Sequence, residues 1–153
     1  MNRVTSAGTS VPASVGSIGE GKYTQTVYSY IRDGRFYEVI RLMKNEVSTH
    51  SKSRAALSLL AYSYYQVQDY ASASDTYERL SKFYPEVMEY RFYYAQSLYK
   101  SAQYPVAQKV SHSIESPEFS ARVRFLKFNI TFRSLNYKLP SNLIRKIWPG
   151  VKC

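Results

Sequence analysis

The sequence predicts an all-α solenoid built from repeated helix-turn-helix units. The first observation is self-similarity at a fixed period, because aromatic residues recur 34 positions apart at Phe36, Tyr70 and Tyr104. The second is that apolar residues within each period fall at i, i+3, i+4 and i+7, which is one face of an α-helix. The third is composition: 16 tyrosines and only 6 glycines favour helices packed through large rings over a turn-rich sheet.

Residues 54–87 show the repeat most completely. The apolar stripes of its two helices are Leu57, Leu60, Ala61 and Tyr64, followed by Tyr70, Ala73, Tyr77 and Leu80. These stripes predict two antiparallel helices, and the small Ala61 and Ala73 let the two backbones approach at the crossing. Pro85 ends the second helix because it lacks an amide donor and disfavours helix at the residue before it. A unit of this length and pattern is the tetratricopeptide repeat.

About three such repeats and an incomplete fourth are predicted, in a tetratricopeptide array over residues 21–136. The repeats lie near residues 21–53, 54–87 and 88–121, and the first helix of the fourth lies over 122–136. Ser116 and Pro117 are expected to cap and open that last helix. Its packing stripe is expected to be Phe125, Phe128 and Phe132, which follow helical spacing.

The two ends of the chain differ in composition from the array. Residues 1–20 are small and polar, which predicts a flexible leader, and residues 137–153 break the repeat and form a divergent basic tail. The chain has a net charge of +10. Residues 1–120 hold 13 basic and 11 acidic residues, whereas residues 121–153 hold 8 basic residues and no acidic one. The excess positive charge therefore lies mainly in the C-terminal end.

Several classes of protein are excluded by the sequence. No run approaches the roughly 20 apolar residues of a membrane span, and no N-terminal block has the pattern of a secretory signal. The single cysteine, Cys153, allows neither an intramolecular disulfide nor a cysteine-based metal site. His50 and His112 stand apart from any Ser-His-Asp or Cys-His pattern. We therefore expect no enzymatic activity, no cofactor and no metal.

Several strings within the repeats go beyond the general tetratricopeptide pattern and resemble one family. They are residues 53–62 (SRAALSLLAY), 90–100 (YRFYYAQSLYK) and 102–105 (AQYP), with residues 30–33 (YIRD) in the first repeat. Over about residues 20–128 the chain resembles the N-terminal repeats of the tetratricopeptide repeat protein 30 family, the tetratricopeptide subunit of the intraflagellar transport B complex. Family members are several times longer, and the chain departs from their pattern after about Ile130.

The resemblance implies a function that the repeats alone do not. It implies a non-enzymatic scaffold, located in the cilium and the cytoplasm, that binds an extended, proline-containing subunit of the B complex inside its superhelix. It also implies roles in cilium assembly and axonemal tubulin polyglutamylation, with kinesin motors and tubulin-modifying machinery as indirect partners.

The residues expected to face a ligand lie on the first helix of each repeat, since these helices line the inner surface of such a superhelix. Positions not used in helix packing are the candidates: Tyr28, Arg32, Ser58, Tyr62, Tyr65, Gln66, Phe92, Gln96, Tyr99 and Lys100. An aromatic groove of this kind suits an extended, proline-containing peptide, whose stiff backbone loses little entropy on binding. Thr24 and Tyr28 replace the lysine and asparagine of chaperone-type repeats, which argues against a carboxylate clamp.

The basic tail supports an alternative hypothesis. Its cations, interleaved with Phe125, Phe128, Phe132 and Trp148, could bind RNA or an anionic membrane through charge and aromatic insertion. In the simpler interpretation these phenylalanines pack within the fourth repeat and the charges occupy its solvated face. Nucleic acid is therefore the less favoured partner, and a peptide-binding scaffold is the leading interpretation.

Overall fold

The structure is a computed structural model that describes residues 22–115 and 117–138. Every regular element in these ranges is an α-helix, which confirms the predicted fold class. The seven helices are α1 (Tyr23–Arg32), α2 (Phe36–Thr49), α3 (Arg54–Gln66), α4 (Tyr70–Phe83), α5 (Met88–Lys100), α6 (Tyr104–His112) and α7 (Ser120–Lys138). None of these helices combines the length and the apolar character that a membrane span requires.

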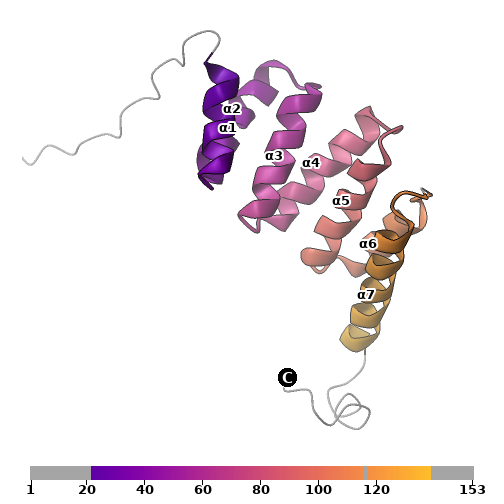
Figure 1. Cartoon of the computed structure of the whole chain (residues 1–153). Helices are drawn as coiled ribbons and strands as arrows, with labels where there is room; N and C mark the ends of the chain where they lie inside the picture. The colour runs from indigo at the N-terminus through magenta and orange to yellow at the C-terminus, as the bar shows by residue number, and fades with distance from the viewer. Residues whose placement is uncertain (1–21, 116, 139–153) are drawn as a thin grey trace, which may run out of the picture.

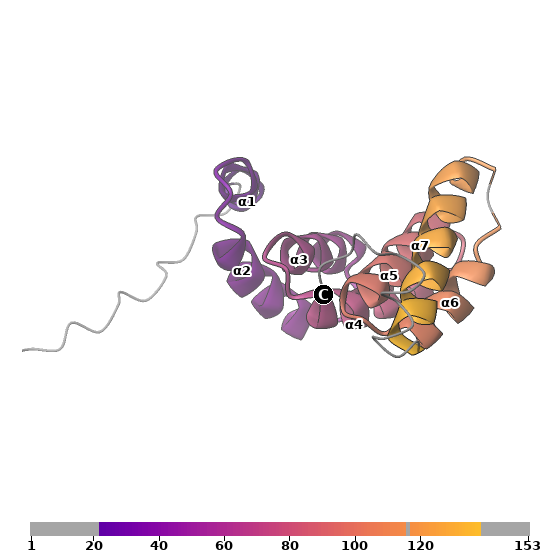
Figure 2. The same cartoon turned by 90° about the horizontal axis from the view of Figure 1, so that it is seen from below.

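The helices form a curved row in which each packs mainly against its neighbours in the chain. Figure 1 shows α1, α3, α5 and α7 side by side, with the even-numbered helices behind them. In the perpendicular view of Figure 2 the row bends into an arc, and α1 and α7 rise at its two ends on the side of the odd-numbered helices. The odd-numbered helices therefore form the inner surface of the arc.

The 34-residue period is visible in both the helix boundaries and the core. The second helices of the three repeats, α2, α4 and α6, begin 34 residues apart, at Phe36, Tyr70 and Tyr104. The alanines at the helix crossings, Ala61, Ala73, Ala95 and Ala107, are all fully buried. Because a larger side chain there would push the two backbones apart, these small residues are what allow each pair to close.

The turns inside the repeats share one backbone position in the left-handed conformation. Gly34, Gln68 and Ala102 follow each other at 34-residue intervals, and each has a positive φ, at 70°, 64° and 62°. A left-handed conformation costs an L-residue roughly 1 kcal/mol, whereas glycine adopts it freely. The first repeat therefore meets the demand of the turn without strain, and the second and third repeats do not.

This shared position predicts a pair of opposite stability changes. We expect Ala102→Gly to raise the free energy of unfolding by about 0.5 to 1 kcal/mol, because the exposed Ala102 loses strain and little packing. Gly34→Ala should lower it by about 1 kcal/mol through the backbone alone, since a Cβ at Gly34 would meet no atom within 4 Å. Urea denaturation followed by circular dichroism measures both changes, and equal signs for the two variants would contradict this account.

The start and the packing face of α7 differ from the sequence prediction. Helix α5 begins 34 residues after α3, but α7 begins at Ser120, only 32 residues after Met88 of α5. Pro117 therefore lies in the turn before the helix and not at its first position, and Ser116 lies outside the described residues. The shorter α6 and the connection that follows it account for the two missing residues.

The two-residue shift moves the packing stripe of α7. The residues buried against α5 and α6 are Val123, Leu126 and Ile130, and Ile130 follows the buried Leu98 by 32 residues. Phe125, Phe128 and Phe132 are 70%, 67% and 37% exposed, so the prediction that these three residues form the packing stripe was wrong. The leader over residues 1–20 lies outside the described residues, as does the basic tail from residue 139 onward.

Candidate functional site

Two columns of predicted residues repeat along the odd-numbered helices, which line the inner surface of the arc. Each column takes one residue from α1, α3 and α5 at 34-residue spacing. The columns are Tyr28, Tyr62 and Gln96, and Arg32, Gln66 and Lys100. All six were predicted to face a ligand, and all six are exposed or half-buried.

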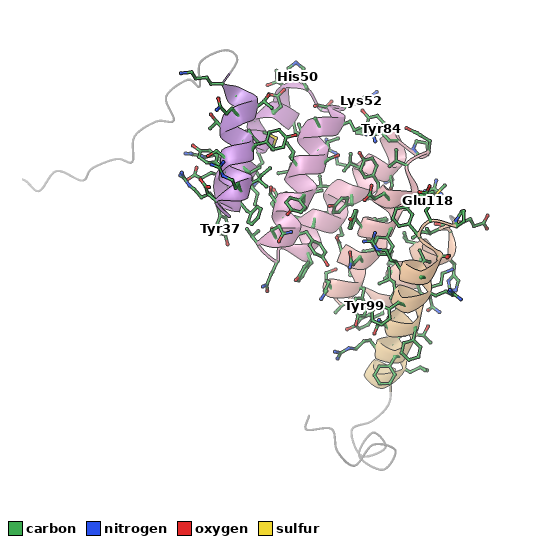
Figure 3. All side chains as sticks on the ribbon, in the orientation of Figure 1. Tyr37, His50, Lys52, Tyr84, Tyr99 and Glu118 are labelled. Carbon is green, nitrogen blue, oxygen red and sulfur yellow. The ribbon has the colours of Figure 1, made fainter. Side chains whose placement is uncertain are left out.

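The predicted residues on α5 meet at one cavity. Phe92, Gln96, Tyr99 and Lys100 line a cavity of about 350 Å³, which α7 completes with Arg122, Phe125, Leu126 and Asn129. Figure 3 labels Tyr99 near the end of α5, on the side that faces α7. The structure thus brings the four predicted residues of the third repeat together at one place.

Phe92 has a different role from the one predicted for it. Its ring is only 3% exposed and stacks on Phe119 with the ring centroids 5.9 Å apart. The guanidinium of Arg122 lies 4.5 Å from the centroid of the same ring. Phe92 is therefore part of the core between α5 and α7, because the fourth repeat covers it, and it forms the base of the cavity.

The predicted residues on α3 are divided between packing and exposure. Ser58 is engaged in a contact between repeats, since its hydroxyl lies 3.1 Å from the Tyr90 hydroxyl, which also accepts a hydrogen bond from Arg54 Nε at 2.8 Å. That bond is also the main reason why the pKa of Arg54 is raised. Gln66 is exposed, and its side chain makes no hydrogen bond to another described residue.

Of the three tyrosines on α3, the two that were predicted to face a ligand, Tyr62 and Tyr65, are partly accessible. Tyr62 is 40% exposed and contacts Phe36 edge-on, with the centroids 5.9 Å apart. Tyr65 is half-buried against Tyr70 at 5.2 Å, and this burial, more than the neighbouring Tyr70 and Tyr93, raises the pKa of its hydroxyl. Part of each ring thus packs against a neighbouring ring, and the rest is accessible to a ligand.

At the N-terminal end of the arc, Tyr28 and Arg32 line an open cavity of about 740 Å³ along α1. Tyr28 is 62% exposed and also borders a smaller cavity of about 200 Å³ between α1, α2 and α3. The structure therefore places these two residues at the opposite end of the groove from the α5–α7 cavity.

Sequence reasoning missed four residues of the α5–α7 cavity: Arg122, Phe125, Leu126 and Asn129. They belong to the fourth repeat, and extending a 34-residue period into it assigns Phe125 to the core. A 32-residue spacing from Leu98 to Ile130 is the signal that identifies the correct face. In the described ranges, no three or more histidine, cysteine, aspartate or glutamate side chains are grouped so as to hold a metal ion.

Comparison with known proteins shows that the chain is similar in sequence to one group of relatives. The chain is 44% identical over 115 residues to intraflagellar transport protein 70A of Xenopus tropicalis, a match that covers 75% of this chain and 18% of the relative. It is 39% identical over 133 residues to intraflagellar transport protein 70A2 of Mus musculus, covering 87% of this chain and 20% of the relative. The chain is similar to part of intraflagellar transport protein 70.

The name that these relatives share agrees with the intraflagellar transport family that the sequence resembles. The match to protein 70B of Mus musculus, at 38% identity, reaches 137 residues and 90% of this chain. The chain spans about a fifth of the length of these relatives. No protein-family model matches the chain.

Proposed function

We propose that the chain is a non-enzymatic scaffold of intraflagellar transport that binds an extended partner peptide along the inner surface of its arc. The observation that carries this proposal is the α5–α7 cavity, where residues chosen for their repeat positions lie together and present Gln96, Tyr99 and Lys100. The relatives named intraflagellar transport protein 70 support the cellular process. An all-helical array with an exposed aromatic inner surface is the architecture that such binding requires.

The proposed partner is an extended, proline-containing subunit of the transport complex. Proline holds a peptide in an open conformation, so that its rings and flanking side chains can contact the exposed edges of Tyr62, Tyr65 and Tyr99 at low entropic cost. We propose the cilium and the cytoplasm as the sites of action, and a role in cilium assembly. A contribution to axonemal tubulin polyglutamylation, or contact with a kinesin motor, would be indirect through the same complex.

A double substitution tests the proposal. We expect Tyr65→Ala with Tyr99→Ala to abolish capture of the proline-containing subunit, because each change removes a ring at a separate point of the groove. Capture is measured by pull-down with the purified chain, and circular dichroism follows its helical content. Tyr37→Ala is the matched control, since Tyr37 is 75% exposed on the outer helix α2 and is labelled at the edge of the molecule in Figure 3.

The outcomes are distinct. Loss of capture with helical content retained supports the groove, and Tyr37→Ala should capture the subunit as the unchanged chain does. Undiminished capture by a folded double variant would rule out the groove as the binding surface. If the double variant loses helix, the exposed pair Gln66→Ala and Lys100→Ala provides the same test without removing a packed ring.

A further inference from the structure

The inner and outer helices of the arc differ in charge. The outer helices α2, α4 and α6 are nearly balanced, with five basic and four acidic residues. The inner helices α1, α3, α5 and α7 contain one acidic residue, Glu89. Their nine basic residues are Arg32, Arg54, Arg91, Lys100, Arg122, Arg124, Lys127, Arg133 and Lys138. Among the seven described helices, the excess of positive charge thus lies on those that line the groove.

Three of the four acidic residues of the outer helices lie beside a local partner. Glu38 pairs with Arg41 and Arg35, Glu46 lies 2.9 Å from His50, and Glu78 lies 2.9 Å from Lys82. Across the described ranges, no ion pair involves a side chain of α3, α5 or α7. The basic side chains that the structure describes on α3, α5 and α7 therefore have no carboxylate within ion-pair distance.

Two of these cations line the α5–α7 cavity, whose lining includes no acidic residue. Lys100 is exposed at the end of α5. Arg122 is held by aromatic faces, with its guanidinium 4.5 Å from the Phe92 centroid and 5.5 Å from that of Phe119. A guanidinium stacked in this way keeps N–H groups at its edge, where they can donate hydrogen bonds to a carboxylate. Arg122 is thus oriented by packing before any ligand arrives.

We infer that the α5–α7 cavity binds an acidic segment of the partner peptide, with carboxylates at Lys100 and Arg122 and apolar groups against Tyr99 and Phe125. This inference rests on the proposed function, and it specifies the chemistry of the ligand at one end of the groove. The cavity favours a peptide over single-stranded RNA. Binding of single-stranded RNA stacks bases on the faces of successive exposed rings. In this cavity Phe92 is buried, and Tyr99 presents only part of its ring because it packs against Tyr104, which leaves Phe125 as the exposed ring.

A pair of peptides tests the inference with the full chain. The probe is a short fluorescein-labelled peptide of alternating proline and glutamate, and its counterpart carries glutamine in place of glutamate. We expect the glutamate peptide to bind about tenfold more tightly in fluorescence anisotropy at low salt, with the difference shrinking as salt is added. Lys100→Glu should weaken the glutamate peptide about fivefold and leave the glutamine peptide nearly unchanged.

Lys109→Glu is the matched control, because it makes the same charge change on the outer helix α6, where Lys109 is exposed. It should affect binding much less than Lys100→Glu. Arg122→Gln provides a second variant, whose folding is checked by thermal denaturation because Arg122 also packs on Phe92.

Three results would overturn the inference. Equal affinity for the two peptides would refute the acidic preference and leave the proposed peptide groove standing. Equal losses from Lys100→Glu and Lys109→Glu would show that only overall charge matters. Displacement of the glutamate peptide by oligouridylate at lower concentration than by unlabelled peptide would assign the cavity to nucleic acid. The proposed function itself is decided separately, by capture of the proline-containing subunit with the tyrosine variants.

Discussion

Replacing Leu80 with alanine is expected to lower the free energy of unfolding by about 3 to 4 kcal/mol. Leu80 is completely buried on α4, within the cluster that joins the first, second and third repeats. Truncating a fully buried leucine loses its transfer free energy and leaves a cavity that the neighbouring helices close only in part. Because α4 packs on both α3 and α5, the change acts at two interfaces of the array.

Urea denaturation measures this effect, and Leu135→Ala is the matched control. Leu135 lies on α7 and is 56% exposed, so the same truncation should cost less than about 0.5 kcal/mol there. A loss of less than about 1 kcal/mol for Leu80→Ala would show that the central interface is loosely packed.

Alkaline destabilisation centred on Tyr77 is the second large effect. The side chain is 5% exposed on α4, and its burial, followed by the neighbouring Tyr93 and Glu89, raises the pKa of its hydroxyl well above the ordinary value of 10.0. The buried form must therefore stay protonated, while the unfolded chain ionises near pH 10. Stability from this group is complete below pH 10 and is lost as the pH rises from there toward the folded-state pKa.

Between about pH 9 and pH 11.5, Tyr77 alone should account for a loss of about 2 kcal/mol. Tyr65 and Tyr94, whose pKa values are also raised by burial, should add smaller losses. Urea midpoints measured across this range test the expectation. Tyr77→Phe should flatten most of the dependence, whereas Tyr37→Phe, at a 75% exposed position, should leave it intact. An equal pH dependence of the urea midpoint in both variants would show that a group other than Tyr77 is responsible.

Much of the fold could be predicted because it depends on local spacing. The second helices begin at the predicted 34-residue intervals, and the stripes of the second repeat are buried or half-buried as expected, from Leu57 to Leu80. The fourth repeat could not be predicted in the same way. Its register depends on the length of α6 and on how the chain turns before Ser120, and neither leaves a periodic signal. Two residues lost there exchange the buried and exposed faces of α7.

The candidate site, like the fold, could be predicted where it depends on spacing within one helix and not where it depends on contacts between repeats. Repeat positions on one helix placed Gln96, Tyr99 and Lys100 at a common cavity. The contribution of Arg122 depends on which face α7 turns toward α5, and the burial of Phe92 depends on Phe119 and Arg122 lying over it. Contacts between repeats therefore decide which groups are available to a ligand, and a single repeat read alone cannot supply them.

The neighbour-to-neighbour packing of the helices has a mechanical consequence. Beyond successive helices, the main additional contact is between α5 and α7, so no large interface ties α1 to α7 (Figure 2). The curvature is then the sum of small rotations at a series of interfaces, each of which can change slightly without breaking its core. Such an arc behaves as a soft spring. A peptide that contacts both ends would stretch or tighten it, and part of the binding free energy would be held as elastic strain spread over the whole array.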